Sequence, residues 1–184
     1  MKSPTRSLLA AIVAASLSGA AGATDAADLE NTLYMDLKDG RVVIEMRPDL
    51  APKHVAQIKR LTRKGFYDGT VFHRVIDGFM VQGGDPDGNG TGGSGNKLPA
   101  EFSDERHLRG VTSMARSRNP DSADSQFFIM LGDSPHLDGA YTVWGKVVSG
   151  MNFVDNIKKG DSRQNGSVSD PDKIVRLCVA ADVK

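Results

Sequence analysis

Residues 72–85, FHRVIDGFMVQGGD, decide how the rest of the chain is understood. This stretch places one cation, Arg74, in a run of apolar side chains and ends in Gly83-Gly84. Removing an arginine from water costs free energy unless an acceptor pairs with it. Arg74 is therefore either held by an acceptor inside the protein or available to the oxygen of a ligand. We expect the second.

The first residues have the layout of a secretory signal peptide. Lys2 and Arg6 precede an apolar run at 8–17, and small residues follow at 21–23. The apolar run is too short to span a bilayer comfortably. We expect residues 1–23 to be removed after Ala23, which would place the protein in the periplasm or outside the cell. An uncleaved membrane anchor is the alternative.

Composition limits the remaining choices. The chain has 184 residues, with 23 basic and 23 acidic side chains. The leader carries two of the basic residues and none of the acidic ones, so the mature chain has a small negative charge. No basic block remains, and a nucleic-acid partner is not expected. Stable membrane insertion is not expected either, and the remaining length suits one domain over residues 28–184 that acts as a monomer.

The pattern of apolar residues predicts a mostly β chain with two helices. Residues 33–37 and 42–46 alternate around Lys38-Asp39-Gly40, which is typical of a β-hairpin. A helix is expected from Pro52 to Gly65, with Asp49 supplying negative charge before its first turn. Strands are expected at 110–114, 126–131, 141–148 and 173–183, and a second helix from Met151 that Gly160 ends.

The glycine-rich loop at 85–96 contains two misleading motifs. Its glycines satisfy GxGxxG, but a dinucleotide site needs a helix to open directly after the loop, and Pro99 argues against one. Its acidic residues match the start of a calcium loop, but Asn96 stands where that loop needs glutamate. We expect the glycines to serve the backbone, and we expect neither a metal nor a cofactor.

The other reactive side chains have simple interpretations. His54 is expected on the surface of the first helix, and His73 is expected to point away from Arg74. Cys178 cannot form an internal disulfide because it is the only cysteine, and its apolar neighbours predict a core position. No serine has the surroundings of an activated nucleophile.

Two further stretches suggest a binding surface. Residues 125–129, SQFFI, would place Gln126 and Phe128 on one face of a strand. An ordinary core strand with a buried glutamine is the alternative. Residues 135–141 carry Leu137 and Tyr141, and tyrosine combines a large apolar ring with one hydroxyl, as pocket walls often require.

Together these stretches resemble the cyclophilin family of peptidyl-prolyl cis–trans isomerases. The matching segments are FHRVIDGFMVQGGD (72–85), NGTGG (89–93), SMA and SQFFI (113–115 and 125–129), LDG (137–139) and VWGKV (143–147). The resemblance covers about residues 32–183. It implies an eight-stranded antiparallel β-barrel closed by two α-helices, with a groove on the outer surface. With its leader, the chain resembles the periplasmic bacterial members.

The resemblance also implies the roles of individual residues. Arg74, Gln82 and Phe79 would form the catalytic set, with Gln82 orienting the guanidinium. The pocket for the proline ring would be apolar, the segment at 115–117 would run beside the peptide, and the backbone of Arg116 would pair with it. The substrate-binding residues implied in this way are Met80, Gly90, Ala115, Arg116, Ser117, Gln126, Phe128, His136, Leu137 and Tyr141.

Two positions depart from the eukaryotic members of the family. Those members carry tryptophan where His136 stands and histidine where Tyr141 stands. Because the tryptophan supports tight cyclosporin binding, we expect weak cyclosporin affinity with catalysis retained. Arg116 and Ser117 also replace smaller or neutral residues, which affects the preference for the residue before proline.

The expected activity needs no nucleophile and no metal. Rotation about a peptide bond is slow because of its double-bond character, with a barrier of ~18–20 kcal/mol. A fixed cationic donor stabilises the twisted state more than the planar one. We therefore expect an isomerase that assists the folding of exported proteins. A non-catalytic proline-peptide-binding module or chaperone on the same fold is the alternative.

Overall fold

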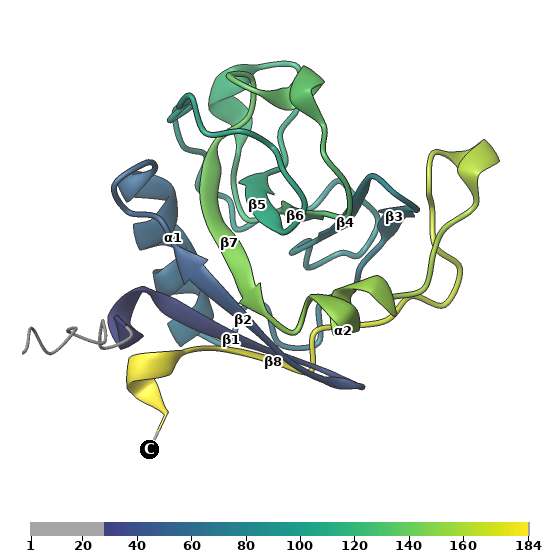
Figure 1. Cartoon of the computed structure of the whole chain (residues 1–184), viewed down its shortest axis with the longest axis horizontal. Helices are drawn as coiled ribbons and strands as arrows, with labels where there is room; N and C mark the ends of the chain where they lie inside the picture. Colours follow the sequence, from purple (N-terminus) through teal and green to yellow (C-terminus); the bar gives the residue numbers. More distant parts are fainter. Residues whose placement is uncertain (1–27, 184) are drawn as a thin grey trace, which may run out of the picture.

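One antiparallel sheet organises the molecule. The computed structural model describes residues 28–183, so the expected leader and its cleavage position lie outside the described residues. The sheet has eight strands in the order β3-β4-β6-β5-β7-β2-β1-β8, and it curls round a core (Figure 1). The strands are β1 (Thr32–Leu37), β2 (Gly40–Met46), β3 (Arg74–Ile76), β4 (Met80–Gly83), β5 (Val111–Met114), β6 (Phe127–Met130), β7 (Val143–Ser149) and β8 (Arg176–Val179).

Two α-helices and five short 3-10 turns complete the described chain. The prediction of a mainly β fold with eight antiparallel strands and two helices is confirmed. The helices are α1 (Pro52–Arg63) and α2 (Met151–Asp155), and the turns are η1 (Leu29–Asn31), η2 (Pro120–Ser122), η3 (Pro135–Leu137), η4 (Ser162–Gln164) and η5 (Ala180–Asp182).

The predicted hairpin and first helix form as expected. β1 and β2 pair in register around Lys38-Asp39. α1 begins at Pro52, and Gly65 follows its end with φ +66°, a left-handed conformation that glycine adopts without steric cost. Val55 and Ile58 are buried on the inner face of the helix.

The expectation that His54 lies on the surface was wrong, and the helix start has an acceptor that was not expected. The Asp49 carboxylate binds Arg47, whereas Glu101, 48 residues beyond Lys53, accepts from the backbone N–H groups of Lys53 and His54. The His54 ring is fully buried, and its Nδ1 lies 2.7 Å from the same carboxylate. No local pattern could have paired the helix with Glu101.

The two edge strands are joined by irregular chain instead of by a strand ladder. The backbone N–H of Phe72 donates to Asp172, and that of Ile174 donates to Thr70, each at 2.9 Å. These bonds tie the segment before β3 to the segment before β8. The curled sheet is thus completed by loops at that point.

The second helix and the late strands are shorter than predicted. α2 stops at Asp155 because the chain beyond it turns toward β3, where the backbone N–H of Gly160 donates to Val75. The last expected strand is regular only over Arg176–Val179 and then enters η5. Cys178 is buried there, as predicted.

The core fills the inside of the curl with large side chains. Trp144, Phe127 and Tyr67 are almost fully buried, and the Phe127 ring meets Trp144 edge-on at 5.7 Å. Within residues 28–183, neither helix has the length and apolar character that crossing a bilayer requires.

Candidate active site

The Arg74 guanidinium is held by two amide side chains and one backbone carbonyl. Its Nη1 donates to Gln82 Oε1 at 3.2 Å. Its Nε donates to the backbone oxygen of Asn165 at 3.0 Å, and its Nη2 donates to Asn165 Oδ1 at 3.0 Å. Its Nη1 also makes a long contact of 3.9 Å with Met80 Sδ. A guanidinium has five N–H donors, so one N–H of Nη2 has no partner among these contacts and one N–H of Nη1 is only weakly engaged.

Gln82 is itself held by a second glutamine. Arg74 and Gln82 are cross-strand partners on β3 and β4. The Gln82 amide donates to Gln126 Oε1 at 3.0 Å, and the Gln126 amide donates to the backbone oxygen of Gly92 at 2.9 Å. The guanidinium is therefore connected to the glycine-rich loop through a line of neutral amides.

No carboxylate neutralises Arg74. None of the ion pairs formed among residues 28–183 includes this guanidinium. Arg74 is half-buried, and loss of water around it lowers its pKa, opposed only by the Tyr141 hydroxyl. An arginine remains charged even so. The site thus keeps an uncompensated positive charge at a partly dry position.

A small cavity of about 110 Å³ opens beside the guanidinium. Alternation along β6 places Phe128 at the cavity, because its neighbours Phe127 and Ile129 point into the core. By liquid-water volume the cavity has room for roughly four water molecules. Its lining residues are Arg74, Phe79, Met80, Gln82, Ala115, Arg116, Phe128, Leu137 and Tyr141.

A longer cavity of about 420 Å³ continues from the small one. The two share Gln82, Ala115 and Arg116 in their linings, so they form one groove. The longer cavity adds Gly90, Ser117 and Gln126 from the predicted set. It also adds Lys97 and Asp124, which sequence reasoning did not identify. Of the residues predicted to bind substrate, only His136 lines neither cavity.

The residues at the rim contact one another. His136 is exposed in η3, and its ring centroid lies 5.7 Å from that of Phe79. The guanidinium of Arg116 lies 4.4 Å from the centre of the Tyr141 ring and donates to the backbone oxygen of Ala140. Arg116 therefore holds Tyr141 with its side chain and leaves its backbone beside the groove.

The glycine-rich loop has the structural role that was expected. The Asp85 carboxylate accepts from the backbone N–H groups of Asp87, Asn89 and Gly90, which leaves it committed to folding the loop. These bonds lower the pKa of Asp85 against the opposing effect of its burial. A dinucleotide site would require a helix directly after the loop, but the next regular element in the described chain is strand β5.

Comparison with known proteins identifies the family. A model described as cyclophilin type peptidyl-prolyl cis-trans isomerase/CLD matches residues 32–179. The chain belongs to the cyclophilin family. A probable peptidyl-prolyl cis-trans isomerase of Brucella suis is 57% identical over 97% of this chain and 98% of its own length. Peptidyl-prolyl cis-trans isomerase B of Bacillus subtilis is 47% identical over 71% of this chain and 92% of its own.

Solved cyclophilin structures share the fold. A cyclophilin from Hirschia baltica has a TM-score of 0.76 at 28% identity and covers 85% of this chain and 76% of its own. A Cryptosporidium parvum cyclophilin, crystallised in the presence of the dipeptide Ala-Pro, has a TM-score of 0.73 at 30% identity, with 80% and 98% covered. The activity is peptidyl-prolyl cis–trans isomerisation, and cyclophilins bind proline-containing peptides.

The cyclophilin groove is backed by a buried chain of polar groups that sequence analysis did not find. His107 Nδ1 lies 3.1 Å from Asp138 Oδ1, and His107 Nε2 lies 3.0 Å from Ser113 Oγ. Ser113 is the cross-strand partner of Phe128, and the His107 ring stacks on Phe128 with centroids 6.2 Å apart. The segments SMA and LDG contained two of these residues, but only the fold brings them together.

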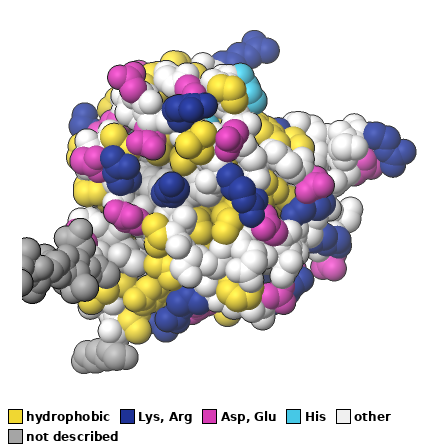
Figure 2. All heavy atoms as spheres, viewed as in Figure 1, with side chains coloured by type: hydrophobic (Ala, Val, Ile, Leu, Met, Phe, Trp, Pro, Cys, Tyr) yellow, Lys and Arg dark blue, Asp and Glu magenta, His cyan; other side chains and the backbone are white. Residues whose placement is uncertain are grey.

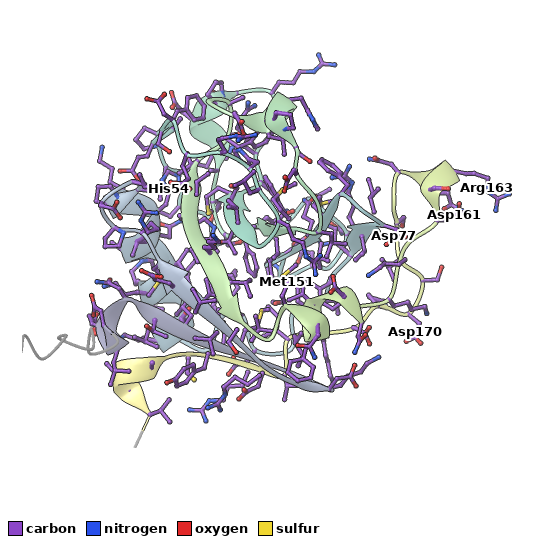
Figure 3. All side chains as sticks on the ribbon, viewed as in Figure 1. His54, Asp77, Met151, Asp161, Arg163 and Asp170 are labelled. Atoms are coloured by element: carbon purple, nitrogen blue, oxygen red, sulfur yellow. The ribbon has the colours of Figure 1, made fainter. Side chains whose placement is uncertain are left out.

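Sequence analysis did not identify Asn165, which lies between the second predicted helix and the last predicted strand. The loop between α2 and β8 stands out from the rounded body of the cyclophilin, with basic atoms at its end (Figure 2). Figure 3 places Asp161 and Arg163 in this loop, on the opposite side of the molecule from His54. The pair Asn165-Gly166 was the available signal, since asparagine tolerates the left-handed conformation seen at φ +54°.

A larger hollow elsewhere does not have the properties of an active site. It measures about 730 Å³ and lies beside β1 and β2. Its arginine, Arg47, is paired with Asp49 and lies near Glu105. Among residues 28–183, no group of three or more histidine, cysteine or acidic side chains is arranged to hold a metal ion.

Proposed function

We propose that Arg74 is the catalytic donor of this isomerase and that its substrates are exported proteins. The observation that carries the first part is the uncompensated guanidinium beside a small cavity that Phe79, Met80 and Phe128 also line. As an X–Pro bond twists, resonance is lost, the nitrogen gains a lone pair and the carbonyl changes polarity. The partnerless N–H of Arg74 Nη2, with the Nη1 N–H that contacts only the Met80 sulfur, stabilises these changes more than it stabilises the planar bond.

The small cavity anchors the proline ring while the preceding carbonyl rotates. Met80, Phe128 and Leu137 are almost fully buried and supply its apolar surface, while Phe79 closes one side. Low polarity near Arg74 strengthens its interaction with the reacting bond, because water no longer screens the charge. The fixed amide partners mean that the donor needs no reorganisation during the reaction.

The longer cavity accepts the polypeptide on the N-terminal side of the proline. Its lining includes residues 115–117, the Gly90 loop and Gln126. The backbone N–H groups of Ala115 and Ser117 already donate to Gln126 and Ser122, so the backbone of Arg116 is the one proposed to pair with the substrate. Main-chain bonding suits an extended substrate of varied sequence, because it does not depend on side-chain identity.

Replacement of Arg74 tests the catalytic assignment. In a protease-coupled assay on a short Ala–Pro peptide, Arg74→Ala should lower kcat/KM by about 10²–10³-fold, the usual effect of losing one fixed donor. The matched control is Arg41→Ala, which removes an exposed arginine paired with Asp36 on β2. Both variants should unfold at nearly the wild-type temperature. Near-normal activity of Arg74→Ala would overturn the assignment.

Export rests on the leader at residues 1–23. Its basic start, short apolar run and small residues at 21–23 support cleavage after Ala23 and a periplasmic or secreted enzyme. Cell fractionation of a C-terminally tagged chain, with N-terminal sequencing of the product, is the test. We expect a mature protein that begins at Thr24 outside the cytoplasm. An intact leader on a cytoplasmic protein would refute the proposal.

Cyclosporin should bind weakly. His136 stands at the rim against Phe79 and offers less apolar surface than the tryptophan of the eukaryotic members. A dose–response of isomerase inhibition measures this directly. We expect His136→Trp to increase the affinity for cyclosporin. Nanomolar potency of the unaltered enzyme would show that His136 does not limit binding.

A further inference from the structure

We propose that Asn165 is a positioning residue that orients the Arg74 guanidinium for catalysis while leaving its charge intact. The proposal rests on the catalytic role proposed for Arg74. Its basis is the contact between the two residues, which lie 91 positions apart in the chain.

Asn165 holds one complete edge of the guanidinium. Its backbone oxygen accepts from Nε and its side-chain oxygen accepts from Nη2, each at 3.0 Å. Gln82 accepts from Nη1 on the other side. These three contacts fix both the position and the rotation of the guanidinium. The N–H of Nη1 that meets the Met80 sulfur at 3.9 Å and the partnerless N–H of Nη2 therefore have a defined direction.

The chemistry of the partners matters as much as their geometry. Arginine most often pairs with carboxylates in bidentate fashion, and such a pair would offset the charge and occupy further donors. Here both side-chain acceptors are amides, which orient the group without neutralising it. This choice explains how a half-buried cation can be rigid and still available to a substrate.

The loop that carries Asn165 is built against the catalytic strand. The backbone N–H of Val75 donates to Gly166 at 2.8 Å, and that of Val168 donates to His73 at 3.1 Å. A Cβ atom at Gly166 would come within 2.9 Å of the Val75 oxygen, so only glycine permits this approach. His73 and Val75, the neighbours of Arg74 in the chain, thus bind the loop that orients the Arg74 guanidinium.

The backbone of Asn165 suits its task and suggests the test variants. It has φ +54° and ψ +32°, a left-handed conformation in which glycine and asparagine are the least strained residues. Asn165→Gly therefore removes the side-chain acceptor and keeps the backbone oxygen. Asn165→Asp keeps the shape and adds a negative charge beside Arg74.

The experiment measures kcat and KM of these variants on the Ala–Pro peptide. Asn165→Asp should lower kcat by about 10- to 100-fold, because the charge of Arg74 is offset and its free donors are drawn to the carboxylate. Asn165→Gly should lower kcat by about three- to tenfold. KM should change less than about twofold in both, since the apolar cavity is untouched. The matched control is Asp170→Gly, at φ +53° in the same loop with a fully exposed side chain, and it should leave kcat unchanged.

A double-mutant comparison separates positioning from a general effect on the fold. In the Arg74→Ala background, Asn165→Asp should cause no further loss, because the group that it acts on is absent. An equal loss in both backgrounds would overturn the role of Asn165 and leave that of Arg74 intact. An unchanged kcat of Asn165→Asp, with Arg74→Ala inactive, would do the same. Full activity of Arg74→Ala would instead refute the catalytic assignment.

A measurement on the unaltered enzyme covers the case in which a variant fails to fold. The Nε–H proton of Arg74 should give a resolved NMR signal that exchanges slowly with water, because it is bonded to the Asn165 oxygen. Rapid exchange of that proton, at the rate of the exposed Arg163, would contradict the proposed hold.

Discussion

Two polar clusters flank the proline cavity, and they differ in what remains unused. On one side, Arg74 is held by neutral amides and lines the cavity with one N–H that has no partner in the described chain and one that meets only the Met80 sulfur. On the other side, Ser113, His107 and Asp138 form a chain with the sequence of contacts found in serine hydrolases. Ser113 and His107 are almost completely buried, and their hydrogen bonds are directed to one another.

The difference shows that accessibility decides chemical function more than residue identity does. A hydroxyl at 0% exposure cannot reach an acyl group, however well its histidine is placed. The buried chain instead supports the back of Phe128, on which the His107 ring stacks. The guanidinium has no catalytic motif of that kind around it, yet its free donors face the space that a substrate enters.

Removal of His107 should give the largest effect on stability. His107→Ala leaves a cavity and deprives Ser113 and Asp138 of a partner, so the free energy of unfolding should fall by about 2–4 kcal/mol. Urea unfolding measures this, with the exposed His136→Ala as control, expected within about 0.5 kcal/mol of wild type. If His107→Ala were as stable as the control, the buried chain would not be a support.

Stability should also fall in mild acid. Burial lowers the pKa of His107, opposed by Asp138, and burial also lowers the pKa of His73. The unfolded chain then binds these protons more readily, so stability is present above the unfolded pKa of about 6.5 and is lost as pH falls below it. Each group can contribute up to about 1.4 kcal/mol per pH unit. Urea midpoints between pH 7.5 and 5 test this, and a flat profile would contradict it.

The same pH series sharpens the contrast between the clusters. Arg74 does not titrate in this range, so kcat/KM of the folded enzyme should change little while stability declines. Assays at peptide concentrations far below KM, at a temperature where the protein stays folded, measure this. An activity that follows the histidine titration would mean that the buried chain acts directly in catalysis.

The smallest effect is expected from Ser113→Ala. The hydroxyl contributes one buried hydrogen bond, so the free energy of unfolding should fall by about 1 kcal/mol. Isomerase activity should stay within about threefold of wild type, and a fluorophosphonate should not label the unaltered enzyme. Covalent labelling of Ser113 would show that the triad-like geometry is chemically active after all.

The fold and the groove could be predicted to a large extent because their signals are local or periodic. Alternation placed Gln126 and Phe128 on one face of a strand, and the family resemblance assigned Phe128 to the groove and Gln82 to Arg74. Gly65 after α1 and the turn at Lys38-Asp39 follow from simple backbone preferences.

The remaining features could not be predicted because they depend on contacts between distant segments. Glu101 holds the start of α1 from 48 residues beyond Lys53, which also buries His54. Asn165 reaches Arg74 from a loop whose composition is simply polar. In both places a remote acceptor completes the contact, and the pattern of a single sequence does not reveal which distant residue it is.

The contact between Arg74 and Asn165 has a consequence for the order in which the enzyme is made. A ribosome that has released the chain as far as α2 has delivered Arg74, the proline cavity and both glutamines, but not the asparagine that orients the cation. Such a nascent chain would not yet have the contact between Asn165 and Arg74, so it could not use its full activity on X–Pro bonds of its own sequence. On the proposed role of Asn165, full activity begins only when the loop that carries this residue has been made and has packed against β3.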